Sequence, residues 1–176
     1  MEQAGEVPGP VLIRDATTDD LVAICDLTNA LIPTTTVAWR DDLATIGEQG
    51  EWFDERRRRG DPVLVADDDG EVVGYCCWGS FRGGDRFPGY RHTAELTIHV
   101  HGDRHGEGIG RALMLALVER ARANGIHVLV AGVDADNVSS IDFHRSLGFV
   151  EVARMPEVGR KFDRWLDLVL LQRIID

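Results

Sequence analysis

The sequence predicts a single α/β domain with a mixed central β-sheet flanked by α-helices. Strand patterns alternate with helix patterns along the chain, and one strand–helix–strand crossover spans residues 93–133, an arrangement typical of parallel neighbours. A turn signal, Asp67-Asp68-Asp69-Gly70, joins two apolar runs and predicts an antiparallel hairpin. The 176 residues with 44% hydrophobic content suit one domain with its own core.

The first half of the chain predicts a flexible tail over residues 1–10, followed by a domain over 11–176. Thr17 and Asp20 have capping-box spacing and predict a helix start. The β-branched run after Pro33 breaks that helix. The expected elements are a strand at 11–14, helices at 17–29 and 41–59, and hairpin strands at 62–66 and 71–78.

The second half predicts the crossover and a strand-rich end. A Gly- and Arg-rich loop at 81–91 precedes it, and Asn124-Gly125 is a helix stop signal. The expected strands are 93–100, 127–133, 149–154 and 165–174, and the expected helices are 109–123 and 137–147.

The charge balance narrows the range of partners. A formal net charge of −11 disfavours nucleic acid and anionic membranes, since both are polyanions. No apolar run is long enough to span a bilayer, and the first ten residues do not resemble a signal peptide. Three cysteines without a metal spacing are typical of reduced thiols in a cytoplasmic protein.

A glycine-rich turn is the clearest chemical motif. Gly106, Gly108 and Gly110 alternate where a strand pattern passes into a helix pattern, so the backbone can approach a ligand closely. The following helix starts with unpaired N–H groups and a positive dipole end, a combination suited to phosphate or pyrophosphate. No Gly-Lys-Ser/Thr follows, and the spacing differs from the G-x-G-x-x-G of dinucleotide-binding folds.

The turn, His105-Gly-Glu-Gly108-Ile-Gly110, resembles the Q/R-x-x-G-x-G/A acetyl-CoA signature of the GNAT superfamily of N-acetyltransferases, and the element order from about residue 11 to 174 resembles the GNAT fold. His105 stands where that family usually has Gln or Arg, and Arg104 is one position early. The resemblance implies acetyl-CoA as co-substrate. The implied contacts are Ile98, His99, Val100, Arg104, His105, Gly106, Gly108, Ile109, Gly110, Arg111, Asn137 and Ser140.

Two side chains are candidates for proton transfer. Glu95 shares one face of its expected strand with Thr97 and His99, and a carboxylate there can deprotonate an incoming amine. The alternative is a solvated strand carboxylate. His144 stands where the superfamily often has a Tyr acting as general acid toward the departing thiolate; a structural histidine is the alternative.

Arginine-rich loops are the candidates for substrate binding. Arg82, Arg86 and Arg91 lie in one loop, and Arg160, Lys161 and Arg164 lie in another. Paired guanidinium groups suit carboxylate, phosphinate or phosphonate, and a solvated loop is the alternative. By contrast, the run Arg56–Arg59 is interpreted as solvated at a helix end. The segments 34–39, 90–95 and 159–167 resemble phosphinothricin and methionine sulfoximine acetyltransferases. That resemblance implies Glu95 as base, Thr36, Arg82, Arg91 and Lys161 as substrate-binding residues, and a homodimer.

Three alternatives accompany this interpretation. His99, His101, Asp103 and His105 could in principle hold a transition metal, although they fall where acetyl-CoA is expected, and no metal is predicted. Another amine, such as a polyamine, an aminoglycoside or a protein terminus, could be the acceptor. A non-catalytic acetyl-CoA sensor is the third alternative. The hypothesis from the sequence is acetylation of the α-amino group of a small acidic amino-acid analogue of the phosphinothricin or methionine sulfoximine/sulfone type.

Overall fold

The computed structural model describes residues 11–83 and 86–176; the predicted tail at 1–10 lies outside them. One seven-stranded sheet has the order β1-β2-β3-β4-β5-β7-β6. Its strands are β1 (Leu12–Asp15), β2 (Val63–Asp68), β3 (Glu71–Ser80), β4 (Thr93–Val100), β5 (Val128–Asp134), β6 (Val150–Lys161) and β7 (Arg164–Ile174). The helices are α1 (Leu21–Leu31), α2 (Ile46–Arg59), α3 (Ile109–Ala123) and α4 (Val138–Ser146).

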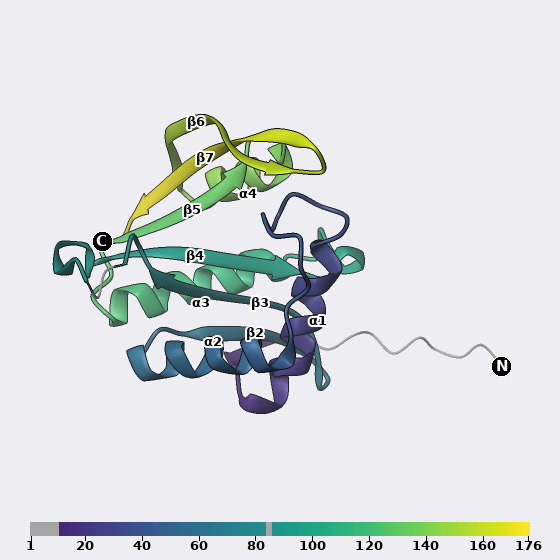
Figure 1. Cartoon of the computed structure of the whole chain (residues 1–176). Helices are drawn as coiled ribbons and strands as arrows, with labels where there is room; N and C mark the ends of the chain where they lie inside the picture. Colours follow the sequence, from purple (N-terminus) through teal and green to yellow (C-terminus); the bar gives the residue numbers. More distant parts are fainter. Residues whose placement is uncertain (1–10, 84–85) are drawn as a thin grey trace.

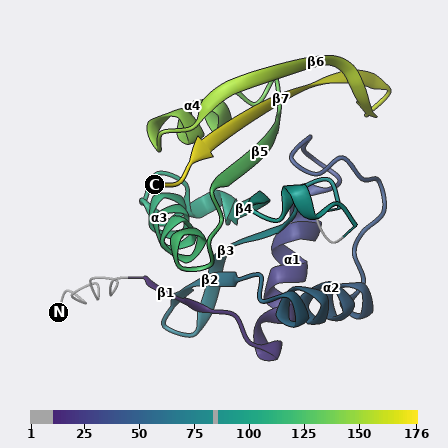
Figure 2. The ribbon, with the colours of Figure 1, turned by 90° about the vertical axis from the view of Figure 1, so that its left-hand side faces the viewer.

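Helices cover both faces of the sheet, which confirms the predicted α/β class. Figure 2 shows α1 and α2 on one face and α3 with α4 on the other. Among the strands of the described residues, only β4 and β5 pair in parallel, and the other neighbours are antiparallel. The parallel pair is the one that the α3 crossover connects, since parallel neighbours need such a connection.

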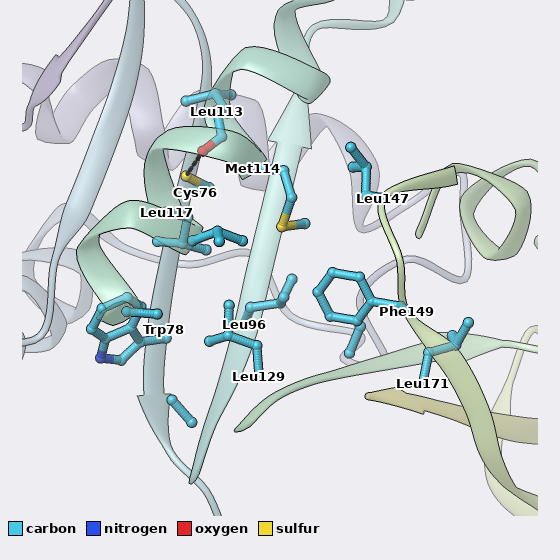
Figure 3. Packing of buried hydrophobic residues seen from close by; sticks show 14 of the residues in the cluster. Cys76, Trp78, Leu96, Leu113, Met114, Leu117, Leu129, Leu147, Phe149 and Leu171 are labelled. Carbon is cyan, nitrogen blue, oxygen red and sulfur yellow. Dashed lines mark hydrogen bonds between the residues drawn. The ribbon is translucent and has the colours of Figure 1, made fainter. Parts of the chain in front are cut away.

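The larger core lies between the sheet and the α3 face. Leu113, Met114 and Leu117 of α3 pack toward Leu96 of β4 and Trp78 of β3, all of them buried (Figure 3). A smaller core on the opposite face joins α1 and α2 to β2 and β3. Side chains therefore alternate between two packed faces, as the strand period requires.

Several boundaries differ from the prediction. Helix α2 begins at Ile46 rather than Asp41, because Thr45 caps it: its hydroxyl accepts from Glu48 N–H, and the Glu48 carboxylate accepts from Thr45 N–H. Strand β6 extends to Lys161 rather than Arg154. It is an edge strand, where Pro156 removes no ladder bond that the sheet needs.

The hairpin of β6 and β7 extends beyond the rest of the sheet. Figure 2 shows it reaching over the segment that joins α1 to α2. The β6–β7 pairing continues to Lys161 opposite Arg164, and Phe162 and Asp163 form the turn with positive φ. This overhang brings two distant parts of the chain together beside the open end of β4 (Figure 1).

Candidate active site

Strands β4 and β5 separate halfway along, and this fork positions the site. Their register runs from Thr93 opposite Val128 to Glu95 opposite Val130, whereas β4 stays paired with β3 as far as Val100. Beyond Glu95 the β5 side of β4 therefore has no β5 partner.

The backbone of β4 presents hydrogen-bonding groups to this fork. His92 accepts from Val128 N–H across the β4–β5 boundary. Because alternate residues of a strand direct their N–H and C=O groups to the same side, those of Ile98 and Val100 face the fork. These are the backbone groups predicted to contact acetyl-CoA.

A cavity of about 550 Å³ lies at the fork and at the start of α3. Every residue predicted to contact acetyl-CoA lines it, together with four that the sequence did not single out: Leu31, Val37, Ser139 and Phe143. Phe143 lies three residues after Ser140 on α4, so helical spacing could have indicated it. The structure thus brings strand, turn and α4 residues to one cavity.

The glycine turn at the start of α3 has the conformation that its sequence predicts. Gly106 and Gly108 have φ of 87° and 84°, a region that side chains with a Cβ rarely adopt. A Cβ on Gly110 would instead lie 3.4 Å from the Phe143 ring, so this glycine allows close packing of α4. The first helical bond runs from Ala112 N–H to Gly108 O, so the preceding N–H groups remain available to an anion.

The two side chains nearest the turn are already engaged. Arg104 donates at 2.8 Å to Asp68 and at 2.8 Å to Glu107. The Nε2 atom of His105 lies 3.1 Å from the carbonyl oxygen of Val100. Both residues line the cavity, but backbone amides supply most of the unpaired donors for an anion there.

Glu95 lies at the point where the strands separate. A Cβ added to Gly132 of β5 would be 3.4 Å from Glu95 Oε1, so the carboxylate lies against the β5 backbone. The surrounding protein raises the pKa of this carboxyl by desolvation, which makes the carboxylate a stronger base. Glu95 remains exposed to solvent and can therefore be reached by a substrate.

A second cavity, of about 310 Å³, adjoins Glu95. Thr97 lines it, and so do Arg56 and Arg59 of α2. The interpretation of the whole run 56–59 as solvated is therefore wrong. Arg56 lies over the Trp52 ring, 4.4 Å from its centroid. The helical spacing of Trp52, Arg56 and Arg59 could have indicated this inward face.

The predicted substrate-binding arginines lie in the neighbouring loop. Arg82 has φ 49° and lies over the Tyr90 ring at 5.9 Å. Arg91 donates to the carbonyl of Pro88 at 3.0 Å and lines a third cavity, of about 230 Å³, that shares Arg59 with the second.

The structure gives Lys161 and Thr36 roles within the fold. Lys161 is 4% exposed, and its ammonium donates to the carbonyl oxygens of Ile32, Thr35 and Ala38. Those bonds use all three of its donors, so the prediction that it binds substrate is not supported. The Thr36 hydroxyl donates to the buried Asp134 carboxylate.

His144 does not have the geometry of a general acid. It is 3% exposed, and its Nδ1 lies 2.8 Å from the carbonyl oxygen of Ser140. A carbonyl only accepts, so Nδ1 carries the proton, and Nε2 is a buried acceptor with no partner among the described residues. Burial lowers the His144 pKa, which keeps the ring neutral. A neutral ring protonated at Nδ1 has no proton at Nε2 to donate.

The histidines near the turn do not form a metal cluster in the described part of the chain. His101 accepts from Asp103 N–H, whereas the His99 ring packs against Tyr75 at 5.3 Å. Over residues 11–83 and 86–176, no group of three or more His, Cys, Asp or Glu side chains is placed to hold a metal ion.

Comparison with known proteins identifies the family. The acetyltransferase (GNAT) family profile matches residues 24–149. The chain belongs to the GNAT acetyltransferase family. Acetyl-CoA is the co-substrate of this family, and the alternating glycine turn and the open edge of β4 fit an extended thioester with a pyrophosphate.

Relatives of this GNAT enzyme cover nearly its whole length. An L-methionine sulfoximine/L-methionine sulfone acetyltransferase of Pseudomonas aeruginosa is 44% identical over 165 residues, covering 93% of this chain and 94% of that protein. A phosphinothricin N-acetyltransferase of Streptomyces viridochromogenes is 32% identical, with 93% and 87% covered.

Solved GNAT structures agree with the fold. A phosphinothricin acetyltransferase of Sinorhizobium meliloti in complex with acetyl-CoA has a TM-score of 0.89 at 31% identity, covering 95% of this chain and 89% of that chain. A ribosomal-protein-alanine N-acetyltransferase of Brucella melitensis has a TM-score of 0.89 at 44% identity, with 93% and 99% covered.

Proposed function

We propose that this GNAT enzyme transfers acetyl from acetyl-CoA to the α-amino group of a small acidic amino-acid analogue of the phosphinothricin or methionine sulfoximine/sulfone type. The observation that carries the proposal is the position of Glu95 at the β4–β5 fork, where it lines the arginine-lined cavity, while Ile98 to Val100 of the same strand line the cavity of about 550 Å³. The relatives that act on such analogues support the substrate class.

Residues of β4 and of the turn that follows it bind acetyl-CoA and carry out the transfer. The backbone of the turn at 106–111 holds the pyrophosphate, and the N–H groups of Ile98 and Val100 bind the extended arm. Glu95 accepts the proton that the substrate ammonium must lose, since only a neutral amine can attack the thioester carbonyl. A β4 N–H polarises that carbonyl oxygen while the C–N bond forms and the C–S bond breaks.

The remaining predicted residues take supporting roles. Arg82 and Arg91 bind the acidic groups of the substrate. Thr36 and Lys161 hold the segment 32–38 in place, and Val37 in that segment lines the large cavity. His144 is bonded within α4 to the Ser140 carbonyl and is assigned no role in proton transfer.

Release of free thiol from acetyl-CoA tests this function. The panel contains phosphinothricin, methionine sulfoximine, methionine sulfone, ordinary amino acids, spermidine, kanamycin and an alanine-terminated peptide. The peptide is included because the Brucella melitensis structure is named as a ribosomal-protein-alanine N-acetyltransferase. We expect release with the amino-acid analogues. Release confined to the peptide or the cationic amines would replace the substrate class, and cofactor binding without any release would favour a sensor.

The oligomeric state and the cellular location belong to the same proposal. The β6–β7 hairpin exposes Met155, Val158, Phe162 and Trp165, and an exposed apolar patch supports a homodimer. Sedimentation velocity tests it. Three buried free cysteines support a cytoplasmic location. No helix in the described ranges is both long and apolar enough to cross a membrane.

A further inference from the structure

Arg56 reaches the sheet next to Glu95. Gly79 of β3 is the register partner of Glu95 on β4, and a Cβ on Gly79 would lie only 3.1 Å from Arg56 Nη2. Directly opposed Cβ positions in an antiparallel pair are about 4.5–5.5 Å apart. The guanidinium therefore lies about one residue position from the Cβ of Glu95, on the β3 side, in space that a side chain at position 79 would occupy, while the Glu95 carboxylate extends toward Gly132 of β5.

Donors at this place lack partners. In the described ranges, three buried side-chain polar atoms have no hydrogen-bond partner, and two of them are Arg56 Nε and Ser80 Oγ. Both residues line the cavity of about 310 Å³ that Glu95 also lines. Apart from its contact with the Trp52 ring, the hydrogen bonds of Arg56 are weak: a 3.5 Å bond to the Trp52 carbonyl and a bond with the Cys77 thiol. Unpaired buried polar groups are costly in a folded protein, so two beside one cavity point to a ligand.

The charges in this cavity match a zwitterion. Glu95 of β4 offers a carboxylate, and Arg56 of α2 offers a guanidinium that lies over Gly79 of the adjacent strand β3. An α-amino acid carries its ammonium and carboxylate on one carbon, so it can meet both groups at once. Arg59 is bonded to Asp61 at 2.7 Å, which leaves Arg56 as the more available cation.

We propose that Arg56, assisted by the Ser80 hydroxyl, binds the α-carboxylate of the substrate and so places the α-amino group at Glu95. Of the substrate groups, Arg56 then takes the α-carboxylate, which leaves the side-chain sulfone, sulfoximine or phosphinate to Arg82 and Arg91. The inference rests on the proposed function and deepens it, since it makes the enzyme selective for α-amino acids over simple amines.

Kinetics with a matched pair of acceptors test this assignment. The pair is methionine sulfone and its decarboxylated counterpart, 3-(methylsulfonyl)propan-1-amine. Arg56→Met keeps the aliphatic stem over Trp52, and Arg57→Met removes an exposed charge from the same run. Ser80→Ala removes the hydroxyl alone. Thermal unfolding and acetyl-CoA affinity are measured for each variant.

For Arg56→Met we expect kcat/KM with methionine sulfone to fall about 10- to 100-fold, the range of a charged hydrogen bond, mainly through KM. The rate with the decarboxylated amine should not change. Arg57→Met should match the wild type on both acceptors, Ser80→Ala should show a smaller loss on methionine sulfone alone, and Arg56→Lys should recover part of the selectivity.

The contrary results are distinct. An equal loss on both acceptors, or an unchanged preference in Arg56→Met, would overturn the role of Arg56 and leave the proposed function standing. A wild-type enzyme that acetylates both acceptors equally well would instead contradict selectivity for α-amino acids, and with it the inference.

Discussion

The ammonium of Lys161 donates to the carbonyl oxygen of Ile32 at 2.6 Å, across a sequence separation of 129 residues. It also donates to the Thr35 and Ala38 carbonyl oxygens. One buried ammonium therefore supplies hydrogen bonds to three backbone carbonyls of the segment that follows α1. The ring of Trp39 lies so close to Gly159 that a Cβ there would be 2.3 Å from it. The β6–β7 hairpin thus fixes the segment that carries Val37 to the large cavity.

Lys161→Met should destabilise the protein by about 2–4 kcal/mol, because it leaves buried carbonyls without donors. The acetyl-CoA affinity should also fall, since Val37 would lose its support. Urea unfolding and calorimetric titration measure the two effects. Arg160→Met is the control, because that guanidinium is exposed. Unchanged stability in Lys161→Met would show that water satisfies the carbonyls.

Glu95→Gln should lower kcat by about two orders of magnitude or more, since the amide cannot accept the ammonium proton. Desolvation raises the Glu95 pKa, so the wild-type rate should fall as the pH drops through that raised value. The carboxylate form is disfavoured by folding, and the stability of the wild type decreases as pH rises through the same range. The variant should therefore be at least as stable at pH 7. A rate and pH profile equal to the wild type would exclude Glu95 as the base.

Gly108→Ala should cost about 1–2 kcal/mol, because φ at this position is 84° and a Cβ disfavours the left-handed region. Open space surrounds the site, so the cost comes from the backbone conformation alone. A shifted turn should also weaken acetyl-CoA binding. Gly102→Ala is the matched control, since it has open space and no positive φ. Equal effects in the two variants would refute the conformational argument.

His99 should make folding stability depend on pH. Burial lowers its pKa from 6.5 to about 4, so the native ring stays neutral while the unfolded ring protonates. This contribution is fully present above pH 6.5 and is lost as the pH falls toward 4, with a slope of up to about 1.4 kcal/mol per pH unit. Urea unfolding at pH 7, 6 and 5 should show this loss, and His99→Gln should reduce it. If the free energy of unfolding had the same pH dependence in the wild type and in His99→Gln, the loss of stability at low pH would belong to other groups.

Local signals predicted much of the site. The glycines of the turn and the two-residue period of β4 each depend on near neighbours in sequence. The individual acetyl-CoA contacts were implied by the resemblance to the GNAT superfamily, and every one of them lines one cavity. The start of α2 was missed because Thr45 and Glu48 form a capping box that competes with the acidic residues upstream.

By itself the sequence determined the fold class, the turn that begins α3 and the face on which Glu95 lies, because these follow from backbone periods and from glycine conformation. Only the tertiary structure decided which charged and titratable side chains are available to a substrate. The Lys161 ammonium is hydrogen-bonded to a segment far away in sequence, and His144 Nδ1 is bonded to the Ser140 carbonyl. Arg56, by contrast, lines the same cavity as Glu95. A side chain's role depends on its partners and its burial, and long-range packing sets both.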